Sequence, residues 1–231
     1  MWPQANSDDA DRTRRFGRHF MFGTHDFLLF VTAGVLLNIT PGPDMLYIIG
    51  RSSTQGWRAG AAAALGVAAG CVVHIVAAAL GLSAILAASA TAFTILKIIG
   101  AAYLVYVGIS LILSSRSSRR AGRVVALAPV TLRTVFVQGF LTNVLNPKVA
   151  LFFLAFLPQF IDSDAPSKPL AFLFLGAVFN FNGTLWNLLV GWSAARFTVG
   201  IERSKLAVWF NRCIGGLFVY LGVRLVFARQ S

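Results

Sequence analysis

Long apolar stretches, not short alternating ones, organise the 231-residue chain. A helix that crosses a membrane needs about 20 mostly apolar residues, whereas a strand of a membrane barrel needs about ten with alternating polarity. The stretches that meet the helical criterion are residues 27–49, 60–82, 93–113, 134–157, 170–192 and 206–227. The pattern therefore predicts an all-α integral membrane protein with six transmembrane helices.

Prolines interrupt the first and the fourth of these stretches. Residues 38–44 read Asn-Ile-Thr-Pro-Gly-Pro-Asp, and residues 143–148 read Asn-Val-Leu-Asn-Pro-Lys. A proline inside a helix costs about 3 kcal/mol or more, and lipid offers no water to the freed backbone groups. Kinks that only shape the packing are one interpretation. Two breaks at matching places favour another, in which protein, water or a ligand surrounds them.

The two halves of the chain resemble each other. Each half contains three apolar stretches, and the interrupted one comes first. A shift of 114 positions also aligns four pairs: Val105 with Val219, Tyr106 with Tyr220, Gly108 with Gly222 and Leu111 with Leu225. Three helices per half place the halves in opposite orientations, as in many transporters. We therefore expect two inverted three-helix repeats, at about residues 27–113 and 134–228, joined by a basic loop at 114–133.

Composition and charge narrow the class of protein. Of all residues, 57% are apolar and only 12% are charged, which excludes a disordered chain, a disulfide scaffold and an ordinary soluble enzyme. The net charge is +12, but such sparse charge argues against nucleic acid as a partner. Ten of the 20 basic residues lie in the loops after the first, third and fifth stretches, and Arg51 and Arg58 are those predicted for the first of these loops. This distribution predicts that those loops are cytoplasmic and that both termini lie outside.

The first 20 residues conflict with that orientation. They contain four basic residues, Arg12, Arg14, Arg15 and Arg18, and they do not have the pattern of a signal peptide. We expect residues 1–20 to be an extension, disordered or upstream of a true start at Met21. Residues 21–231 are then expected to form a single transmembrane domain.

The two breaks are also predicted helix starts within the membrane. Thr40 has the residue type of an N-cap, and Pro41 suits the first helical position. Asn146 and Pro147 repeat this pair. The positive ends of such half-helices would attract a carboxylate. The candidate substrate-binding residues surround both breaks: Asn38, Thr40, Pro41, Gly42, Pro43, Asp44, Asn143, Asn146, Pro147 and Lys148.

Two of these candidates are charged, and charges at this depth in a membrane are costly and often functional. Asp44 follows the first break and would bind an ammonium, whereas Lys148 follows the second and would help hold a carboxylate. Without substrate, the two could pair with each other. The alternatives are that Asp44 only compensates a helix dipole and that Lys148 snorkels to an interface.

Polar residues in two other stretches are further candidates. The second stretch carries small residues and a histidine four apart, on one face suited to close helix packing: Ala62, Gly66, Gly70, His74 and Ala78. His74 and Asp44 are the candidates for proton coupling, with a histidine hydrogen-bonded inside the bundle as the alternative for His74. In the fifth stretch, Asn180, Asn182 and Thr184 either line a cavity or bond between helices.

Cysteines and histidines do not suggest a metal site or a cofactor. Cys71 and Cys213 lie in apolar stretches and are interpreted as small packing residues. The three histidines are scattered along the chain. We therefore expect no metal and no cofactor.

Motifs from both halves form a combination that is specific, although each alone is not. They read TPGPD at residues 40–44, GWRAG at 56–60, LKIIGAAYL at 96–104, FLTNVLNPK at 140–148 and FFLAFLPQF at 152–160. This combination resembles the lysine exporter and homoserine-threonine exporter family of bacterial amino-acid efflux proteins, over about residues 21–227. The resemblance implies a protein of the bacterial inner membrane that exports amino acids or their derivatives, driven by the proton gradient.

The expected mechanism is alternating access around a midplane site between the two interrupted helices. The expected partners are an amino-acid substrate, protons and the lipid bilayer, and a homo-oligomer is compatible with the sequence. A cation or metal exporter is the nearest alternative. An intramembrane enzyme and a scaffold without transport activity are the others; an enzyme would need paired aspartates, a Ser–His pair or a metal motif inside the bundle.

Overall fold

The computed structural model describes residues 21–82, 128–162 and 164–196, together with single helical positions between residues 84 and 113 and between residues 212 and 223. Most of the predicted third and sixth transmembrane stretches lies outside the described residues. The same is true of the N-terminal extension at residues 1–20, of Cys213 and of most of the basic loop.

The described elements are helical. The first half contains η1 (Met21–Gly23), α2 (Phe27–Ile39), α3 (Pro43–Gln55), α4 (Trp57–Ala77) and the π-helical turn η2 (Ala78–Leu82). The second half contains α7 (Leu132–Val144), α8 (Pro147–Leu151), the π-helical turn η3 (Phe152–Phe156), η4 (Leu157–Phe160) and α9 (Lys168–Arg196). The described residues otherwise show one isolated antiparallel bridge, between Thr24 and Ile161. The predicted all-α fold is confirmed for this part of the chain.

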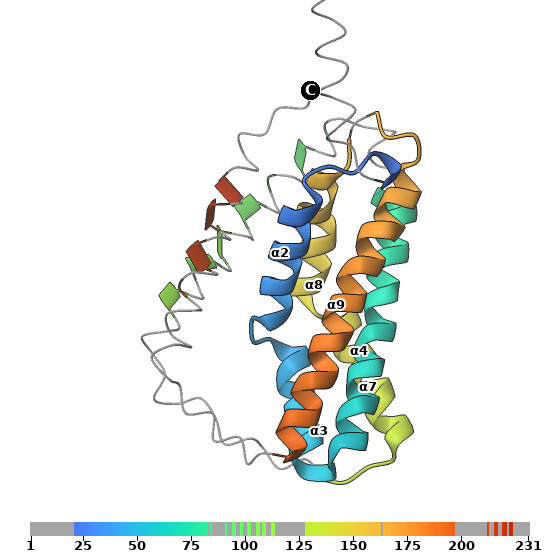
Figure 1. Ribbon diagram of the computed structural model, residues 1–231, viewed down its shortest axis with the longest axis vertical. Coiled ribbons are helices and arrows are strands. Elements are labelled where there is room, and N and C mark those ends of the chain that lie inside the picture. The colour runs from blue at the N-terminus through green and yellow to red at the C-terminus, as the bar shows by residue number, and fades with distance from the viewer. Residues whose placement is uncertain are drawn as a thin grey trace, which may run out of the picture.

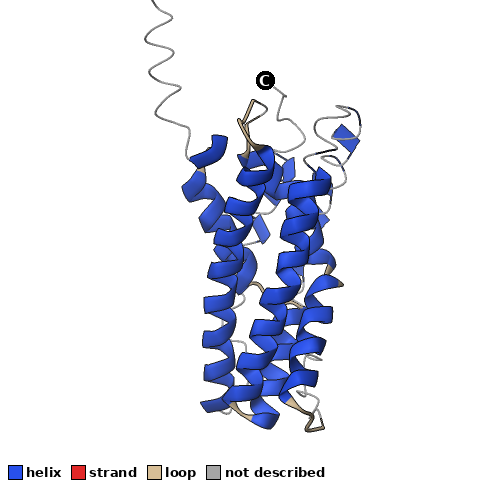
Figure 2. Ribbon diagram, turned by 90° about the vertical axis from the view of Figure 1, so that its right-hand side faces the viewer, coloured by secondary structure: helices blue, strands red, loops and turns tan. Residues whose placement is uncertain are grey.

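Two helices and two bent helix pairs are long and apolar enough to cross a membrane. The unbroken spans are Trp57–Gly81 and α9. The pair α2 and α3 bends by 50°, and α7 bends by 46° against the helical run Pro147–Phe160. In Figure 1 the halves of each pair follow one another along the long axis, beside α4 and α9, and Figure 2 shows the same parallel arrangement from the side. The described residues thus form a multi-pass membrane protein with the two predicted interruptions.

Small residues bring α4 and α7 into backbone contact. A Cβ added at Gly139 would lie 2.6 Å from the carbonyl oxygen of Ala63. At Gly66 an added Cβ would overlap the carbonyl oxygen of Phe136, and Gly70 meets α7 one turn further on. Such close approach is typical of small residues four apart in membrane helices. The predicted packing face of α4 is confirmed, and it joins the first half of the chain to the second.

An aromatic core holds α2, the run from η3 to η4, and α9 together. The ring centroid of Phe152 lies 4.3 Å from that of Phe179 and 6.2 Å from that of Phe30. Phe30 also meets Phe160 in an edge-to-face contact at 5.3 Å. Such aromatic pairs contribute about 0.5–1.5 kcal/mol each beyond their burial. The core therefore fixes the two broken pairs beside each other.

The second half of the first broken pair begins at Pro43, so the predicted start at Pro41 is wrong. The N-cap is Gly42 in an extended conformation, whereas Thr40 ends α2 and donates its hydroxyl to the carbonyl oxygen of Leu36 at 2.7 Å. A residue before proline is sterically driven out of the helical region. Gly42 precedes Pro43 and therefore does not continue a helix from Pro41, so the chain stays extended until Pro43.

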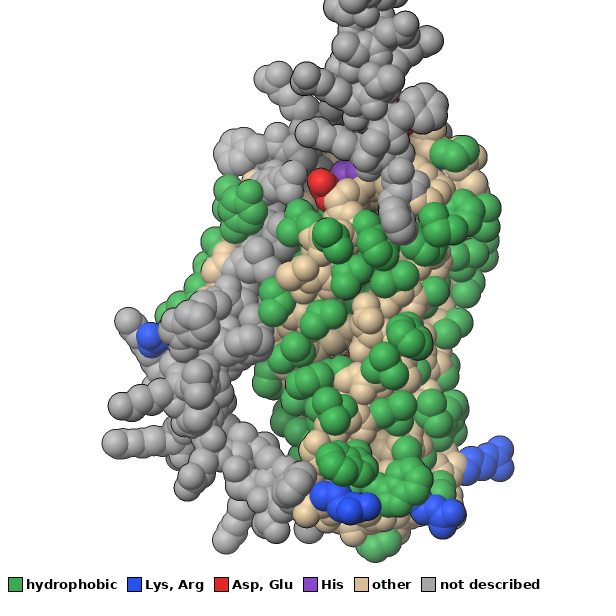
Figure 3. All heavy atoms as spheres, viewed as in Figure 1, with side chains coloured by type: hydrophobic (Ala, Val, Ile, Leu, Met, Phe, Trp, Pro, Cys, Tyr) green, Lys and Arg blue, Asp and Glu red, His purple; other side chains and the backbone are tan. Residues whose placement is uncertain are grey.

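The two ends of the bundle carry side chains of different charge. Arg58, Arg133 and Arg196 lie where α3 meets α4, where α7 begins and where α9 ends. Figure 3 shows basic side chains at this lower end and an acidic side chain and a histidine near the upper end. Arg51 departs from the prediction, because α3 continues to Gln55 and buries this residue inside the helix bundle.

Candidate functional site

The two breaks face each other, and a carboxylate from one binds two amides of the other. Oδ2 of Asp44, in the first turn of α3, accepts hydrogen bonds from Nδ2 of Asn143 at 2.8 Å and Nδ2 of Asn146 at 2.9 Å. Asn143 lies in the last turn of α7, and Asn146 precedes α8. Both asparagines are almost completely buried. The carboxylate of the first half is therefore held at the break of the second half.

Lys148 makes the converse contact from the first turn of α8. Its Nζ donates to the carbonyl oxygens of Leu37 and Thr40, both at 2.8 Å. These carbonyls end α2, where the negative end of the helix dipole favours an ammonium. Lys148 thus points into the bundle and does not snorkel to an interface. The pairing with Asp44 that the sequence allowed is not formed, because each charge binds polar groups of the opposite break.

Asn146 performs two tasks with one amide. Its Oδ1 accepts the backbone N–H of Lys148 at 3.0 Å and so caps α8, with Pro147 at the first helical positions. Its Nδ2 binds Asp44. The predicted capping role of Asn146 is confirmed, and the same side chain links the start of α8 to the carboxylate.

Replacing Asn146 by alanine should lower the stability of the protein. Loss of an N-cap costs about 1 kcal/mol, and loss of a hydrogen bond to a charged group costs about 1.5–3 kcal/mol. We expect the thermal unfolding midpoint in detergent to fall by about 5 °C or more for Asn146→Ala. Asn182→Ala on α9 is the matched control and should shift it little. Equal midpoints for the two variants would contradict the role of Asn146.

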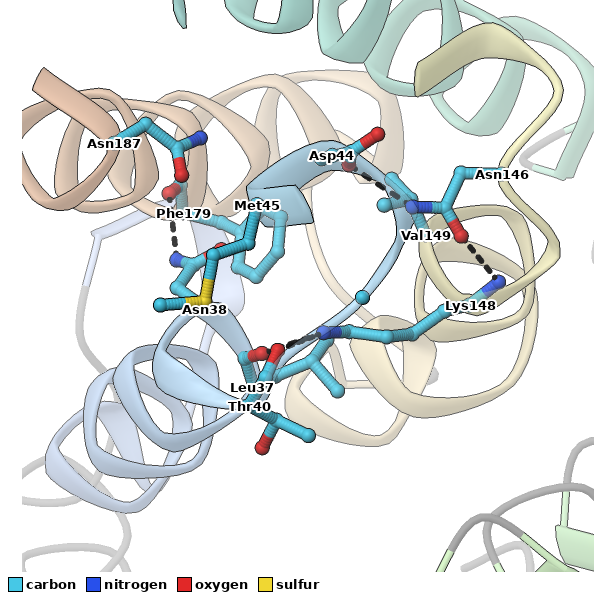
Figure 4. A pocket seen from close by; sticks show the side chains of 11 residues that line it. Leu37, Asn38, Thr40, Asp44, Met45, Asn146, Lys148, Val149, Phe179 and Asn187 are labelled. Atoms are coloured by element: carbon cyan, nitrogen blue, oxygen red, sulfur yellow. Dashed lines mark hydrogen bonds between the residues drawn. The ribbon is translucent and has the colours of Figure 1, made fainter. Parts of the chain in front are cut away.

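A pocket lies between the two breaks and α9 (Figure 4). It is lined by Leu37, Asn38, Thr40, Gly42, Asp44, Met45, Asn146, Lys148, Val149, Phe179 and Asn187. It contains about 350 Å³ of empty space, of which about 30 Å³ admits the centre of a water molecule. One water molecule needs about 10–15 Å³ of such space, so there is room for about two. In this structure the pocket is therefore too small to hold an amino acid.

Two buried acceptor atoms at the breaks have no partner among the described residues. They are Oδ1 of Asp44 and Oδ1 of Asn143. Leaving a buried acceptor unpaired costs about 1–3 kcal/mol, and more when it is charged. Asp44 lines the pocket, whereas Asn143 does not, and Oδ1 of Asn143 lies beside Gly70 of α4. Of the two residues, Asp44 is therefore the one whose free oxygen an ammonium in the pocket could satisfy.

The remaining predicted residues of the breaks have different roles. Asn38 lines the pocket, and its Nδ2 makes a long contact of 3.5 Å with the carbonyl oxygen of Phe179. Gly42 lies against Lys148, since a Cβ there would be 3.4 Å from Nζ. The prolines of the breaks are exposed and do not line the pocket: Pro41, Pro43 and Pro147. They direct the chain and do not contact the cavity.

His74 contacts the site from α4. Its Nε2 lies 3.0 Å from the carbonyl oxygen of Asn143, and its ring stacks on Phe153 with the centroids 6.1 Å apart. His74 thus binds the end of α7, as Lys148 binds the end of α2. It is hydrogen-bonded within the bundle and is separated from Asp44 by a single residue, Asn143.

The polar residues of α9 divide between the two predicted roles. Asn180 bonds between helices, because its Nδ2 donates to the carbonyl oxygen of Ala68 at 3.2 Å. Thr184 donates to the carbonyl oxygen of Asn180 at 2.7 Å. Asn182 lines a second, mainly apolar groove that shares Asn38 with the pocket: Val35, Asn38, Ile39, Asn182, Leu185, Trp186 and Leu189.

Sequence reasoning missed five of the lining residues: Leu37, Met45, Val149, Phe179 and Asn187. Asn187 follows Asn180 by seven positions, which places both on one helix face, so the sequence contained a signal for it. The other four are apolar residues among many others, and no local pattern distinguishes them.

Comparison with known proteins supports this description. The family model of the LysE type translocator matches residues 35–229. An uncharacterised membrane protein of Pseudomonas aeruginosa is 32% identical over 212 residues, covering 90% of this chain and 98% of that protein. The leucine efflux protein of Salmonella typhimurium is 28% identical over 205 residues, covering 88% and 96%. An uncharacterised membrane protein of Bacillus subtilis is 28% identical over 206 residues, covering 87% and 98%. No solved structure matches.

The fold and the site define a multi-pass membrane protein built around two facing broken helices. The match over most of its length shows that the chain belongs to the LysE type translocator family. The resemblance inferred from the motifs is confirmed, and the protein is a translocator, not an enzyme.

Proposed function

We propose that the protein exports amino acids or amino-acid derivatives across the bacterial inner membrane. The observation that carries this proposal is that Asp44 and Lys148 each bind polar groups of the opposite break. These contacts hold a carboxylate and an ammonium beside one pocket. A free amino acid carries the complementary pair of charges. Membership of a translocator family, and similarity to a protein named for leucine efflux, support an amino acid as the substrate.

Within this proposal each charged group binds one end of a zwitterion. The substrate's ammonium donates to the carboxylate of Asp44, which lines the pocket and has one unpaired oxygen. Its carboxylate binds Lys148, whose Nζ leaves the carbonyls of α2 when substrate enters. The start of α3 adds favourable N–H groups, because Gly42 provides no side-chain cap.

We further propose six spanning helices in two inverted repeats, within a single domain of residues 21–231. The bends of 50° and 46° at equivalent places support the repeat. The cluster of Arg58, Arg133 and Arg196 supports a cytoplasmic location for that end, with both termini outside. Because the closed pocket admits little more than water, the substrate reaches it only after the bundle opens. Alternating access around the breaks provides that opening.

Proton antiport is the proposed driving reaction, with Asp44 and His74 as the coupling residues. Asp44 lies in the pocket, and His74 is linked to it through Asn143. When Asp44 takes up a proton, it loses the charge that holds the substrate's ammonium. Proton uptake from outside therefore favours substrate release there, which couples the two fluxes in opposite directions.

Proteoliposomes containing the purified protein test the proposal. They are loaded with radiolabelled L-leucine or another amino acid, and the outside is made one pH unit more acidic than the lumen. Such a gradient provides about 1.4 kcal/mol per proton, enough for about a tenfold substrate gradient at one proton per molecule. We expect efflux of at least one amino acid, accelerated by the gradient and slowed by a protonophore. If no amino acid leaves the liposomes, the proposed export function is wrong. If the efflux rate does not depend on the pH gradient, the proposed proton antiport is wrong.

A further inference from the structure

A buried arginine lies between α3 and α7, away from the pocket. Arg51 is only 5% exposed. Its Nη2 donates to Oε1 of Gln138 at 2.6 Å, and its Nη1 donates to the carbonyl oxygen of Ala128 at 2.9 Å and to Oε1 of Gln55 at 3.1 Å. All three acceptors are neutral. The guanidinium therefore carries its charge into the bundle without neutralisation by these partners.

The same residues fasten α3 to the start of the second half. The hydroxyl of Tyr47 donates to the carbonyl oxygen of Val135 at 2.9 Å and lies 3.1 Å from Oε1 of Gln138. Nε2 of Gln55 donates to the carbonyl oxygen of Val130 at 2.8 Å. These bonds connect the last turns of α3 with α7 and the segment before it. They close the bundle at the end that carries Arg58, Arg133 and Arg196.

The guanidinium is also incompletely bonded. Nε of Arg51 is buried and has no hydrogen-bond partner among the described residues, and within the same residues Arg51 forms no ion pair. A buried charge without a counter-ion is costly. The planar edge formed by Nε and Nη2 matches the two oxygens of a carboxylate. In this structure Nη2 donates to Gln138, whereas Nε is buried and has no acceptor among the described residues.

We propose that Arg51 is a second carboxylate-binding site, which receives the substrate at the cytoplasmic entrance before it reaches the midplane pocket. The substrate's carboxylate takes the edge formed by Nε and Nη2 and displaces Oε1 of Gln138. Loss of that bond removes one of the hydrogen bonds that hold α3 to α7 and so favours opening of the entrance. This inference rests on the proposed export function and on the proposed orientation of the chain.

The sidedness of transport tests the proposal. In proteoliposomes with L-leucine, Arg51→Gln should raise the half-saturating concentration on the cytoplasmic face by about tenfold or more and leave that on the outer face unchanged. Gln138→Ala removes the competing acceptor and should lower the cytoplasmic value. Arg58→Gln, an exposed arginine at the same end, is the matched control and should change neither value. If Arg51→Gln and Gln138→Ala shift the cytoplasmic value in the same direction, or both faces shift alike, the proposal is wrong.

A binding measurement separates this inference from a failure of the transport proposal. Isovalerate has the carboxylate and the branched chain of leucine but no ammonium. In the Lys148→Gln variant, which lacks the midplane ammonium, isovalerate at ten times its Kd should raise the thermal unfolding midpoint in detergent by about 3 °C. Adding Arg51→Gln should abolish the shift, whereas adding Arg58→Gln should preserve it. A monodisperse elution profile identifies the variants that fold. If Arg51→Gln does not fold, Arg51→Lys, which keeps the charge, replaces it in the same measurement. No shift in Lys148→Gln, or a shift that survives the loss of Arg51, overturns the proposal.

Discussion

We expect Asp44→Asn to abolish amino-acid export while leaving the fold intact. Asparagine has almost the same size as aspartate and still fits between Asn143 and Asn146. It removes the negative charge, however, and with it the unpaired carboxylate oxygen that is proposed to bind the substrate's ammonium. It also cannot take up and release a proton. Because a charged hydrogen bond and the coupling step are both lost, we expect the export rate to fall roughly 100-fold or more.

Flux of radiolabelled substrate from proteoliposomes measures this effect. Asp164→Asn is the matched control, because Asp164 is exposed in the turn before α9 and does not line the pocket. Its export rate should equal that of the unmodified protein. Elution profiles and thermal unfolding midpoints of both variants check that the fold is preserved. Full export by a folded Asp44→Asn variant would refute the proposed role of the carboxylate.

Gly66→Leu should prevent the protein from folding. A Cβ at this position overlaps the backbone carbonyl of Phe136, and moving α7 away to make room would break the close contact of Gly139 with Ala63. Overpacking in a well-packed interior typically costs about 1–3 kcal/mol, and the cost rises when the obstructing atom belongs to backbone. Because α4 and α7 join the two halves of the chain, their separation also pulls Asn143 away from Asp44.

The yield of monodisperse protein in detergent, together with its thermal unfolding midpoint, measures this loss. Gly81→Leu is the control, since an added Cβ at Gly81 meets nothing within 4 Å. We expect Gly66→Leu to give little monodisperse protein and Gly81→Leu to give the normal amount. Normal yield and stability for both variants would mean that the close contact between α4 and α7 is dispensable.

The two breaks show which features of the structure could be predicted from local sequence rules. The prolines and asparagines of both interrupted stretches predicted where the helices stop, and Asn146 caps α8 as its residue type indicates. The first break differs by two residues, because Gly42 is itself followed by proline and cannot enter a helix. This correction follows from a rule of the same local kind, so the sequence contained the information for it.

Local sequence rules did not predict the burial of Arg51. Its position after an apolar stretch suggested a loop, yet it is buried and bonded to Gln138 of α7 and to Ala128 of the segment before α7. Nothing near Arg51 in the sequence indicates those partners. A charge next to an apolar stretch is equally compatible with a solvated loop and with a buried contact, and only the packing of α7 against α3 distinguishes them.

Helix positions, the interruptions and the class of membrane protein depend on the order of apolar residues, prolines and capping residues, all of which act over a few residues along the chain. The partners of the two partly buried charges at the breaks depend on contacts between distant segments: Asp44 meets Asn146 across 102 positions, and Lys148 meets Leu37 across 111. Hydropathy and helix capping carry no information about such contacts, because they follow from how the two halves pack. The tertiary structure alone therefore decided that Asp44 and Lys148 each bind the opposite break instead of each other.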